Sequence, residues 1–192
     1  MDFFYYGDIL LTTLLSLLTA LPSMLLGIAS WVLTAVAVYV IARRRGLSKL
    51  WLAWVPIMNV WLLGSLSDQY QYVVKRKNTS RRKWLLVLEM MKPVLYIGVI
   101  SFGVLSFAPR GYGISWENAM AAVSFALPLA VVAVTAAVIR FIALYDVFRS
   151  LDPDNAVLFL VLSILFGITE PFFLFFNRDK DAGMPPRREV FE

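Results

Sequence analysis

Four long apolar runs alternate with short polar or basic intervals along this chain. The runs cover residues 24–42, 84–107, 119–139 and 156–176. A helix rises about 1.5 Å per residue, so roughly 20 apolar residues cross a hydrocarbon core of about 30 Å. The pattern therefore predicts an all-α, polytopic membrane bundle with about four transmembrane helices, folded as a single membrane domain over 1–192.

The first apolar stretch, 9–21, is too short to cross a bilayer alone. Thr12, Ser16 and Thr19 recur along it at spacings of four and three, which gives a Leu-rich helix a narrow hydroxyl stripe. Such stripes usually pack against another helix. Pro22 follows directly, and a proline breaks or kinks a helix. We expect an in-plane or partly inserted helix before the first span.

A second interrupted stretch lies at 50–66. It contains Pro56 and Asn59, and its three tryptophans belong to the residue types favoured at the headgroup level. We interpret it as a re-entrant or interfacial segment with a proline-broken helix, and a full crossing is the alternative. A crossing would place one of the two flanking basic clusters outside.

Basic residues cluster at the ends of the apolar runs. Because lysine and arginine concentrate on the cytoplasmic side of short membrane loops, we predict a cytoplasmic basic loop at 67–83 and an N-terminus outside. The same residues are candidates for binding anionic lipid headgroups or for docking a partner. They are Arg43, Arg44, Arg45, Lys75, Arg76, Lys77, Arg81, Arg82 and Lys83.

The side of the polar tail, 177–192, depends on the last apolar run. If 156–176 crosses, the tail lies outside; if the run dips in and returns at Glu170 and Pro171, the tail lies inside. The basic residues of the tail weakly favour the inside, whereas the length of the run favours crossing. We expect the run to cross.

Composition excludes several classes of chemistry. Hydrophobic residues make up 60% of the 192 residues, more than a soluble domain of this size can bury. The chain contains no cysteine and no histidine, which removes thiolate and imidazole catalysis and zinc sites built on those residues. We predict no metal site and no cofactor.

The net charge of +5 follows from membrane topology. Ten of the eighteen lysines and arginines lie between residues 43 and 83, beside apolar runs. The expected partners are therefore anionic membrane lipids, and nucleic acid is not expected.

Five polar residues inside the apolar stretches are candidates for function, because such groups are costly at membrane depth. Glu89 and Lys92 stand three residues apart and can form an ion pair on one helix face, which is the structural alternative to a relay. Glu170 can stay protonated, pair with Arg140 or bind a cationic substrate. The five candidates are Asn59, Glu89, Lys92, Arg140 and Glu170.

The stretch from Gly46 to Gly64 carries the pattern A-W-x-P-x-x-N-x-aromatic-x-L from Ala53 to Leu63. In this pattern the chain resembles a group of uncharacterised bacterial polytopic inner-membrane proteins, and the sequence EPFFL at 170–174 adds a second point of similarity. The resemblance implies a protein of the bacterial cytoplasmic membrane and implies no catalytic residue. The long basic loop and the Leu-rich start depart from that group.

These features favour a non-enzymatic membrane protein: a small transport protein, or an accessory subunit of a larger transport complex, with a cavity near the intramembrane polar residues. Four spans enclose little space, so we expect a homo-oligomer or an assembly with other subunits. One alternative is a regulatory or scaffolding anchor that docks a soluble partner through the basic loop. Another is an enzyme acting on a lipid or prenyl phosphate through Asp146, Asp152, Asp154 and Mg²⁺.

Overall fold

The computed structural model describes residues 2–106 and 116–185, and it places side chains from residue 11 onward. Every regular element in these ranges is helical. Three helices are long and apolar enough to cross a membrane: α1 (Asp2–Arg44), α3 (Arg81–Ser106) and α4 (Trp116–Leu151). The all-helical prediction is thus confirmed, and the described ranges hold three helices of spanning length and apolar composition where four were predicted.

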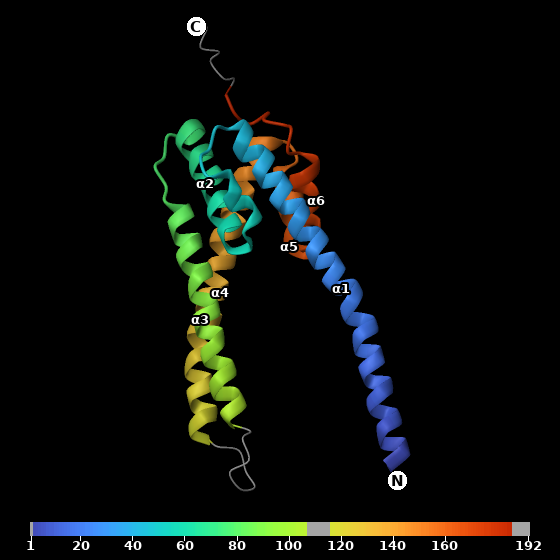
Figure 1. The fold of residues 1–192 in the computed structure, drawn as a ribbon. Helices are drawn as coiled ribbons and strands as arrows, with labels where there is room; N and C mark the ends of the chain where they lie inside the picture. Colours follow the sequence, from blue (N-terminus) through green and yellow to red (C-terminus); the bar gives the residue numbers. More distant parts are fainter. Residues whose placement is uncertain (1, 107–115, 186–192) are drawn as a thin grey trace.

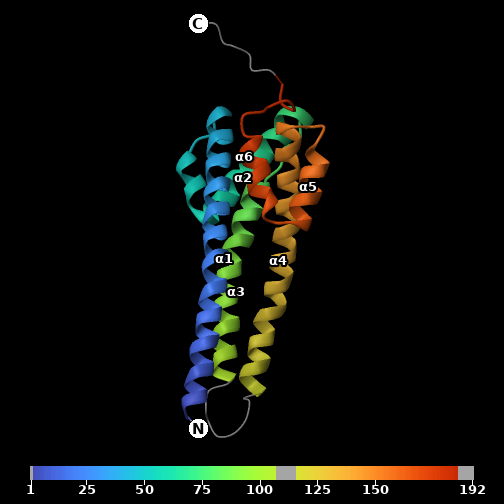
Figure 2. The same ribbon diagram turned by 90° about the vertical axis from the view of Figure 1, so that its right-hand side faces the viewer.

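The three long helices extend from a compact end of the molecule, which we call the head (Figure 1). The head contains the C-terminal part of α1, the 3-10 helix η1 (Leu50–Trp54), α2 (Pro56–Lys75), α5 (Ala156–Leu165) and α6 (Thr169–Phe176). Outside the head, α3 and α4 run side by side (Figures 1 and 2), whereas α1 diverges from them in the view of Figure 1.

The predicted break at Pro22 is absent, because α1 continues through it and includes the stretch 9–21. A proline leaves the carbonyl four residues earlier without its helical donor. The nearby hydroxyls bond to other carbonyls of the same helix: Ser23 donates to the Ala20 carbonyl at 2.8 Å, and Thr19 donates to the Ser16 carbonyl at 3.0 Å. These hydroxyls are therefore bonded within their own helix, and α1 is exposed from residue 11 to residue 29.

The predicted span at 156–176 is wrong. The run forms two short helices, α5 and α6, joined by a turn at 166–168. Aromatic packing folds the run back on itself: Phe159 of α5 stacks on Phe173 of α6 with ring centroids 4.6 Å apart, and both rings contact Phe148 of α4 edge-on. The hairpin therefore begins and ends in the head, and the described part of the tail, 177–185, lies at that same end (Figure 1).

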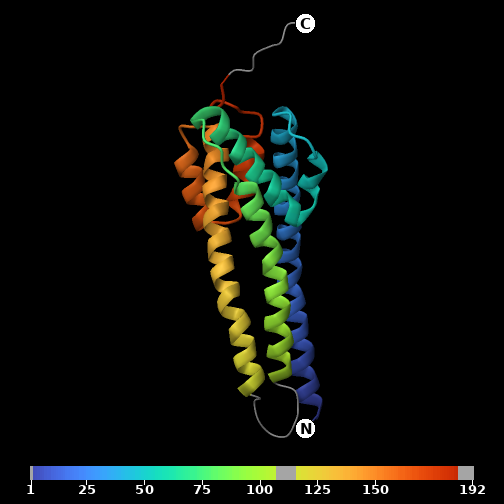
Figure 3. The same cartoon turned by 90° about the vertical axis from the view of Figure 1, so that its left-hand side faces the viewer.

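The segment 50–66 also turns back, as η1 followed by α2 (Figure 3). Helix α2 extends to Lys75, so most of the predicted loop 67–83 is helical and the connection to α3 covers only 76–80. The reason is a stripe of buried side chains that continues past residue 66 and includes Leu62, Leu66 and Tyr70. A helix with one buried face gains more from burial than a solvated loop would.

The hydrophobic core lies in the head. Val38 and Ile41 of α1, Leu62 of α2, Phe148 of α4 and Leu174 of α6 meet there, each at most 1% exposed. Outside the head the long helices bury little, and their leucines and valines are widely exposed. That surface requires lipid or another apolar partner, because water would leave it unstable.

The contact between α3 and α4 is nevertheless close at one level. A Cβ added at Gly98 would meet the Phe125 ring at 2.6 Å, and Phe125 in turn stacks on Phe102 at 5.6 Å. The absence of a side chain at Gly98 is therefore what allows the ring to lie against the α3 backbone.

Candidate functional site

An ion pair between α4 and α6 stands at the centre of the candidate site. Arg140 Nη2 donates to Glu170 Oε1 at 2.7 Å, and the Glu170 side chain is only 9% exposed. Arg140 lies 11 residues before Leu151, the last residue of α4, which places it about 16 Å along the helix from that end. Glu170 lies in the first turn of α6, where the helix dipole favours a negative charge.

A cavity of about 280 Å³ lies on one side of this pair. Its walls include Ser30, Trp31 and Thr34 of α1 and Asn59 of α2, together with the Arg140–Glu170 pair. Two N–H donors among these residues, Trp31 Nε1 and Arg140 Nε, are buried with no hydrogen-bond acceptor in the described part of the chain. Each such donor carries a desolvation cost that an acceptor in the cavity would relieve.

A second cavity, of about 350 Å³, also has this ion pair in its wall. Glu89 and Lys92 of α3 line it with Ser163 of α5, and Lys92 Nζ donates to Glu89 Oε1 at 2.7 Å. Arg140 and Glu170 belong to the walls of both cavities. The structure therefore gathers all five predicted intramembrane candidates around one ion pair.

A buried carboxylate that we did not predict as a structural centre links α2, α3 and α4. The Asp146 side chain is 2% exposed and accepts hydrogen bonds from Ser67 at 2.9 Å, from Gln71 at 2.7 Å and from Arg81. Lys75 Nζ lies 3.6 Å from the same carboxylate. A buried charge is tolerated only when it is paired and hydrogen-bonded, and Asp146 is both.

Asp68 organises the start of α3 from the neighbouring helix. Its carboxylate accepts from Thr79 Oγ1 at 2.6 Å, from the Arg81 backbone N–H at 3.0 Å and from the Arg82 backbone N–H at 3.3 Å. The first N–H groups of a helix have no partner inside the helix, so Asp68 acts as a capping residue supplied from α2.

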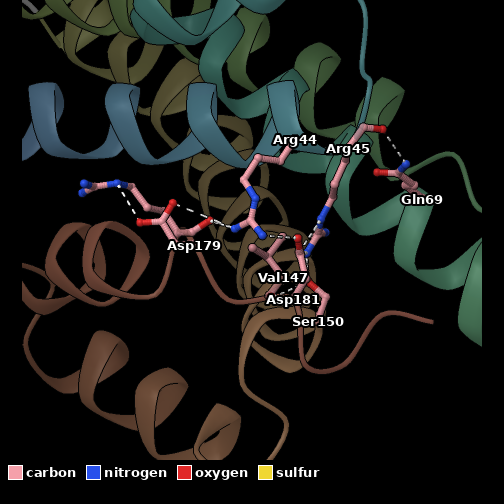
Figure 4. Close-up of polar contacts among 8 residues, drawn as sticks. Arg44, Arg45, Gln69, Val147, Ser150, Asp179 and Asp181 are labelled. Carbon is pink, nitrogen blue, oxygen red and sulfur yellow. Dashed lines mark hydrogen bonds and ion pairs between the residues drawn. The ribbon is translucent and has the colours of Figure 1, made fainter. Parts of the chain in front are cut away.

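The basic end of α1 binds the C-terminal tail (Figure 4). Arg45 is buried and donates to Asp181 Oδ1 at 2.9 Å and to Ser150 Oγ at 2.8 Å. Arg44 forms a second ion pair with Asp181 at 3.1 Å and approaches Asp179 at 4.0 Å. These contacts hold residues 179–181 against α1 and α4.

The tail then covers the C-terminal end of α4. The Ala182 N–H donates to the Leu151 carbonyl at 3.2 Å, and the Gly183 N–H donates to the Ser150 carbonyl at 3.1 Å. A Cβ at Gly183 would lie 2.1 Å from the Arg149 carbonyl oxygen, so only glycine fits this crossing. The tail thereby satisfies carbonyls that a helix end leaves without partners.

The nine basic residues predicted to bind headgroups or a partner divide into two groups. Arg44, Arg45, Lys75 and Arg81 bind acidic side chains of the fold. The others are exposed, and none forms an ion pair within the described ranges: Arg43, Arg76, Lys77, Arg82 and Lys83. Only the second group is free to meet an anionic surface.

The aspartates considered for magnesium have different partners. Asp146 is occupied by the cations described above, whereas Asp152 accepts from the Asn155 side chain at 3.2 Å and from Lys180 at 3.1 Å. Those two bonds, that from Asn155 first, lower the pKa of Asp152 below its ordinary value. Among the residues with described placement, no group of three acidic side chains could hold a metal ion.

Sequence reasoning could find Glu89 and Lys92 because their contact is local. It missed the Asp146 centre because the partners come from residues 65 to 79 positions away in the chain. The tail contacts are more distant still, with 136 positions between Arg45 and Asp181. The available signal was an acidic residue, Asp146, between Arg140 and Arg149 near the C-terminal end of α4.

Neither the protein-family models nor the curated proteins nor the solved structures that were compared with the chain give a match.

Proposed function

We propose that this protein is a non-enzymatic component of membrane transport, acting as a small transport protein or as an accessory subunit of a larger transport complex. The observation that carries the proposal is the Arg140–Glu170 ion pair, which forms part of the walls of two cavities. Charged groups at membrane depth are expensive, and they are retained where they contact a polar solute or its path.

The basic end of the molecule is proposed to face the bacterial cytoplasm, with the N-terminus outside. The clusters near residues 43–45 and 75–83 and the described tail all lie in the head, as the positive-inside rule requires of one cytoplasmic face. The apolar tips of both turning segments are exposed, as Trp54 and Ile57 show in one and Phe166 and Ile168 in the other. Exposed apolar turns of this kind are compatible with two segments that enter the lipid part of the way from the cytoplasmic face and return to it.

Assembly with further helices is part of the proposal. Within the candidate span windows, only 6% of residues are buried for α3 and for α4, and 22% for α1. Three helices with so little mutual burial cannot enclose a path by themselves. A second copy of the chain or another subunit would supply the missing walls.

Cysteine accessibility tests the polar path directly, because the chain has no native cysteine. Ser30→Cys and Ala137→Cys place a thiol in the wall of the first and second cavity, respectively. Val134→Cys is the matched control, three residues from Ala137 on the same helix and 65% exposed toward the apolar surroundings. A water-soluble methanethiosulfonate reagent should modify both cavity thiols in native membranes and leave the control unmodified, since a thiol ionises in water and not in lipid.

Two results would overturn the proposal. Equal reaction at Ala137→Cys and Val134→Cys, or no reaction at either cavity position, would remove the polar path. Purification in nanodiscs tests the assembly: a particle whose mass equals one chain, with no co-purified subunit, would contradict the need for partner helices.

The exposed basic group supports a second candidate function, a regulatory or scaffolding anchor. Arg76, Lys77, Arg82 and Lys83 surround the α2–α3 connection with no acidic partner in the described structure. Changing these four residues to glutamine leaves the Lys75 and Arg81 contacts with Asp146 in place. Loss of a co-purified soluble partner in this variant, with normal membrane insertion, would favour the anchor.

A further inference from the structure

We propose that the second cavity binds a zwitterion, meaning a ligand with one ammonium group and one phosphate or carboxylate group. The inference rests on the proposed transport function and deepens it by naming the substrate class. It depends on the two ion pairs that face this cavity, Glu89–Lys92 and Arg140–Glu170.

The charge of the cavity wall selects for such a ligand. Two carboxylates and two cationic groups give the site no formal net charge. An anion or a cation alone would leave a net charge in a region of low dielectric, which is unfavourable. A zwitterion keeps the sum at zero, and each of its charges can meet an opposite partner from one of the two pairs.

The exposure of the four charged groups predicts the orientation in which the ligand binds. The cationic side chains are the more open, with Lys92 at 32% and Arg140 at 40% exposed, whereas Glu89 is at 18% and Glu170 at 9%. The anionic end of the ligand would therefore lie at the rim and its ammonium deeper, beside the carboxylates.

The cavity has the size of a small ligand or a headgroup, because about 350 Å³ falls at the lower end of the range for small-molecule sites. Ile164 in its wall is 52% exposed, and the neighbouring Val161 and Leu165 of α5 are exposed as well. This apolar rim would accommodate the acyl chains of a lipid. A phosphatidylethanolamine headgroup and a free amino acid both carry the required pair of charges.

Binding to the purified full-length protein in a neutral maltoside detergent tests the inference. The zwitterionic probes are dihexanoyl phosphatidylethanolamine, glycerophosphoethanolamine and alanine, and the anionic comparator is dihexanoyl phosphatidylglycerol. We expect at least one zwitterion to bind about tenfold or more tightly than the comparator. Preference for the dihexanoyl lipid identifies a lipid substrate, and preference for either soluble probe identifies a soluble one.

Charge variants check that the preference arises at this cavity. Glu89→Gln leaves the site with one excess positive charge and should reverse the preference toward phosphatidylglycerol. Lys92→Gln should weaken phosphatidylethanolamine binding without improving that of phosphatidylglycerol. Glu117→Gln, an exposed change at the start of α4, should alter neither. Circular dichroism of each variant establishes that its helices are intact.

The inference fails if the wild-type protein binds no zwitterion, if it binds the anionic comparator equally well, or if an intact Glu89→Gln protein keeps its preference. Should a variant fail to fold, the wild-type comparison still decides. The proposed function fails separately, on the cysteine accessibilities: reactive cavity thiols without zwitterion binding would leave a transport component for another substrate class.

Discussion

At the scale of single residues, the fold depends on carboxylates that collect several donors each. Asp146 holds two cations and two neutral donors, whereas Asp68 caps α3 and Asp181 binds the end of α1. Asp146 and Asp181 join elements that are distant in the sequence, whereas Asp68 joins the consecutive helices α2 and α3. In an apolar protein such contacts specify which helices meet, because hydrophobic surfaces alone pack with little directional preference.

Replacement of Asp146 by asparagine should destabilise the head. The change removes the negative charge and leaves Arg81 and Lys75 beside a neutral amide, so we expect a loss of about 3 kcal/mol of unfolding free energy. Thermal unfolding of the purified protein in detergent, followed by circular dichroism, measures the effect. Asp154→Asn is the matched control, because Asp154 is exposed and forms no side-chain hydrogen bond or ion pair in the described structure. Equal melting temperatures for the two variants would contradict a structural role for Asp146.

At the scale of elements, local sequence signals predicted helices well and helix ends poorly. A proline interrupts the hydrogen bonds of a helix, yet α1 continues through Pro22. The run 156–176 is long enough to cross a bilayer, yet stacking between Phe159 and Phe173 folds it into a hairpin. Neither outcome is encoded in length and hydropathy alone.

The candidate site was predictable in its members but not in its arrangement. The presence of polar side chains inside apolar stretches selected all five residues, and a pairing of Glu170 with Arg140 was one of the alternatives that the sequence left open. The position of that pair in the walls of two cavities depends on the α5–α6 hairpin. Because a crossing was expected there, the sequence could not supply this geometry.

The tail provides a prediction about one such element. Gly183→Ala would drive a methyl group against the Arg149 carbonyl, at a cost of about 1–3 kcal/mol if the tail stayed in place. We expect the tail to detach instead, which would release the Ala182 and Gly183 hydrogen bonds to α4. Hydrogen exchange of residues 179–184 should accelerate while that of α4 upstream of residue 145 stays unchanged. Gly103→Ala is the control, since nothing lies within 4 Å of its added Cβ, and unchanged tail exchange would show that the crossing tolerates a side chain.

At the scale of the whole molecule, three long helices and two turning segments place every described basic cluster at one end. This arrangement predicts that the tail lies on the same side of the membrane as the α2–α3 connection, whereas a fourth span would place it on the opposite side. Lys77→Cys lies in the α2–α3 connection, Lys180→Cys in the tail and Glu117→Cys at the start of α4, and all three positions are exposed. We expect an impermeant maleimide to reach the first two from one side of the membrane and the third from the opposite side.

Comparison of the three cysteine variants tests the hairpin specifically, because only Lys180 lies on different sides of the membrane when 156–176 forms a hairpin and when it crosses. If α5 and α6 return to the head, Lys180→Cys and Lys77→Cys are protected together in intact cells and react together in inverted vesicles. If the run 156–176 crosses, Lys180→Cys reacts with Glu117→Cys instead. Reaction of Lys77→Cys from outside the cell would refute the cytoplasmic assignment but not the hairpin. The side of the membrane that each end faces and the fold of the hairpin are thus tested by separate comparisons. The cavity lined by the Glu89–Lys92 and Arg140–Glu170 ion pairs depends on the fold of the hairpin and not on which side the head faces.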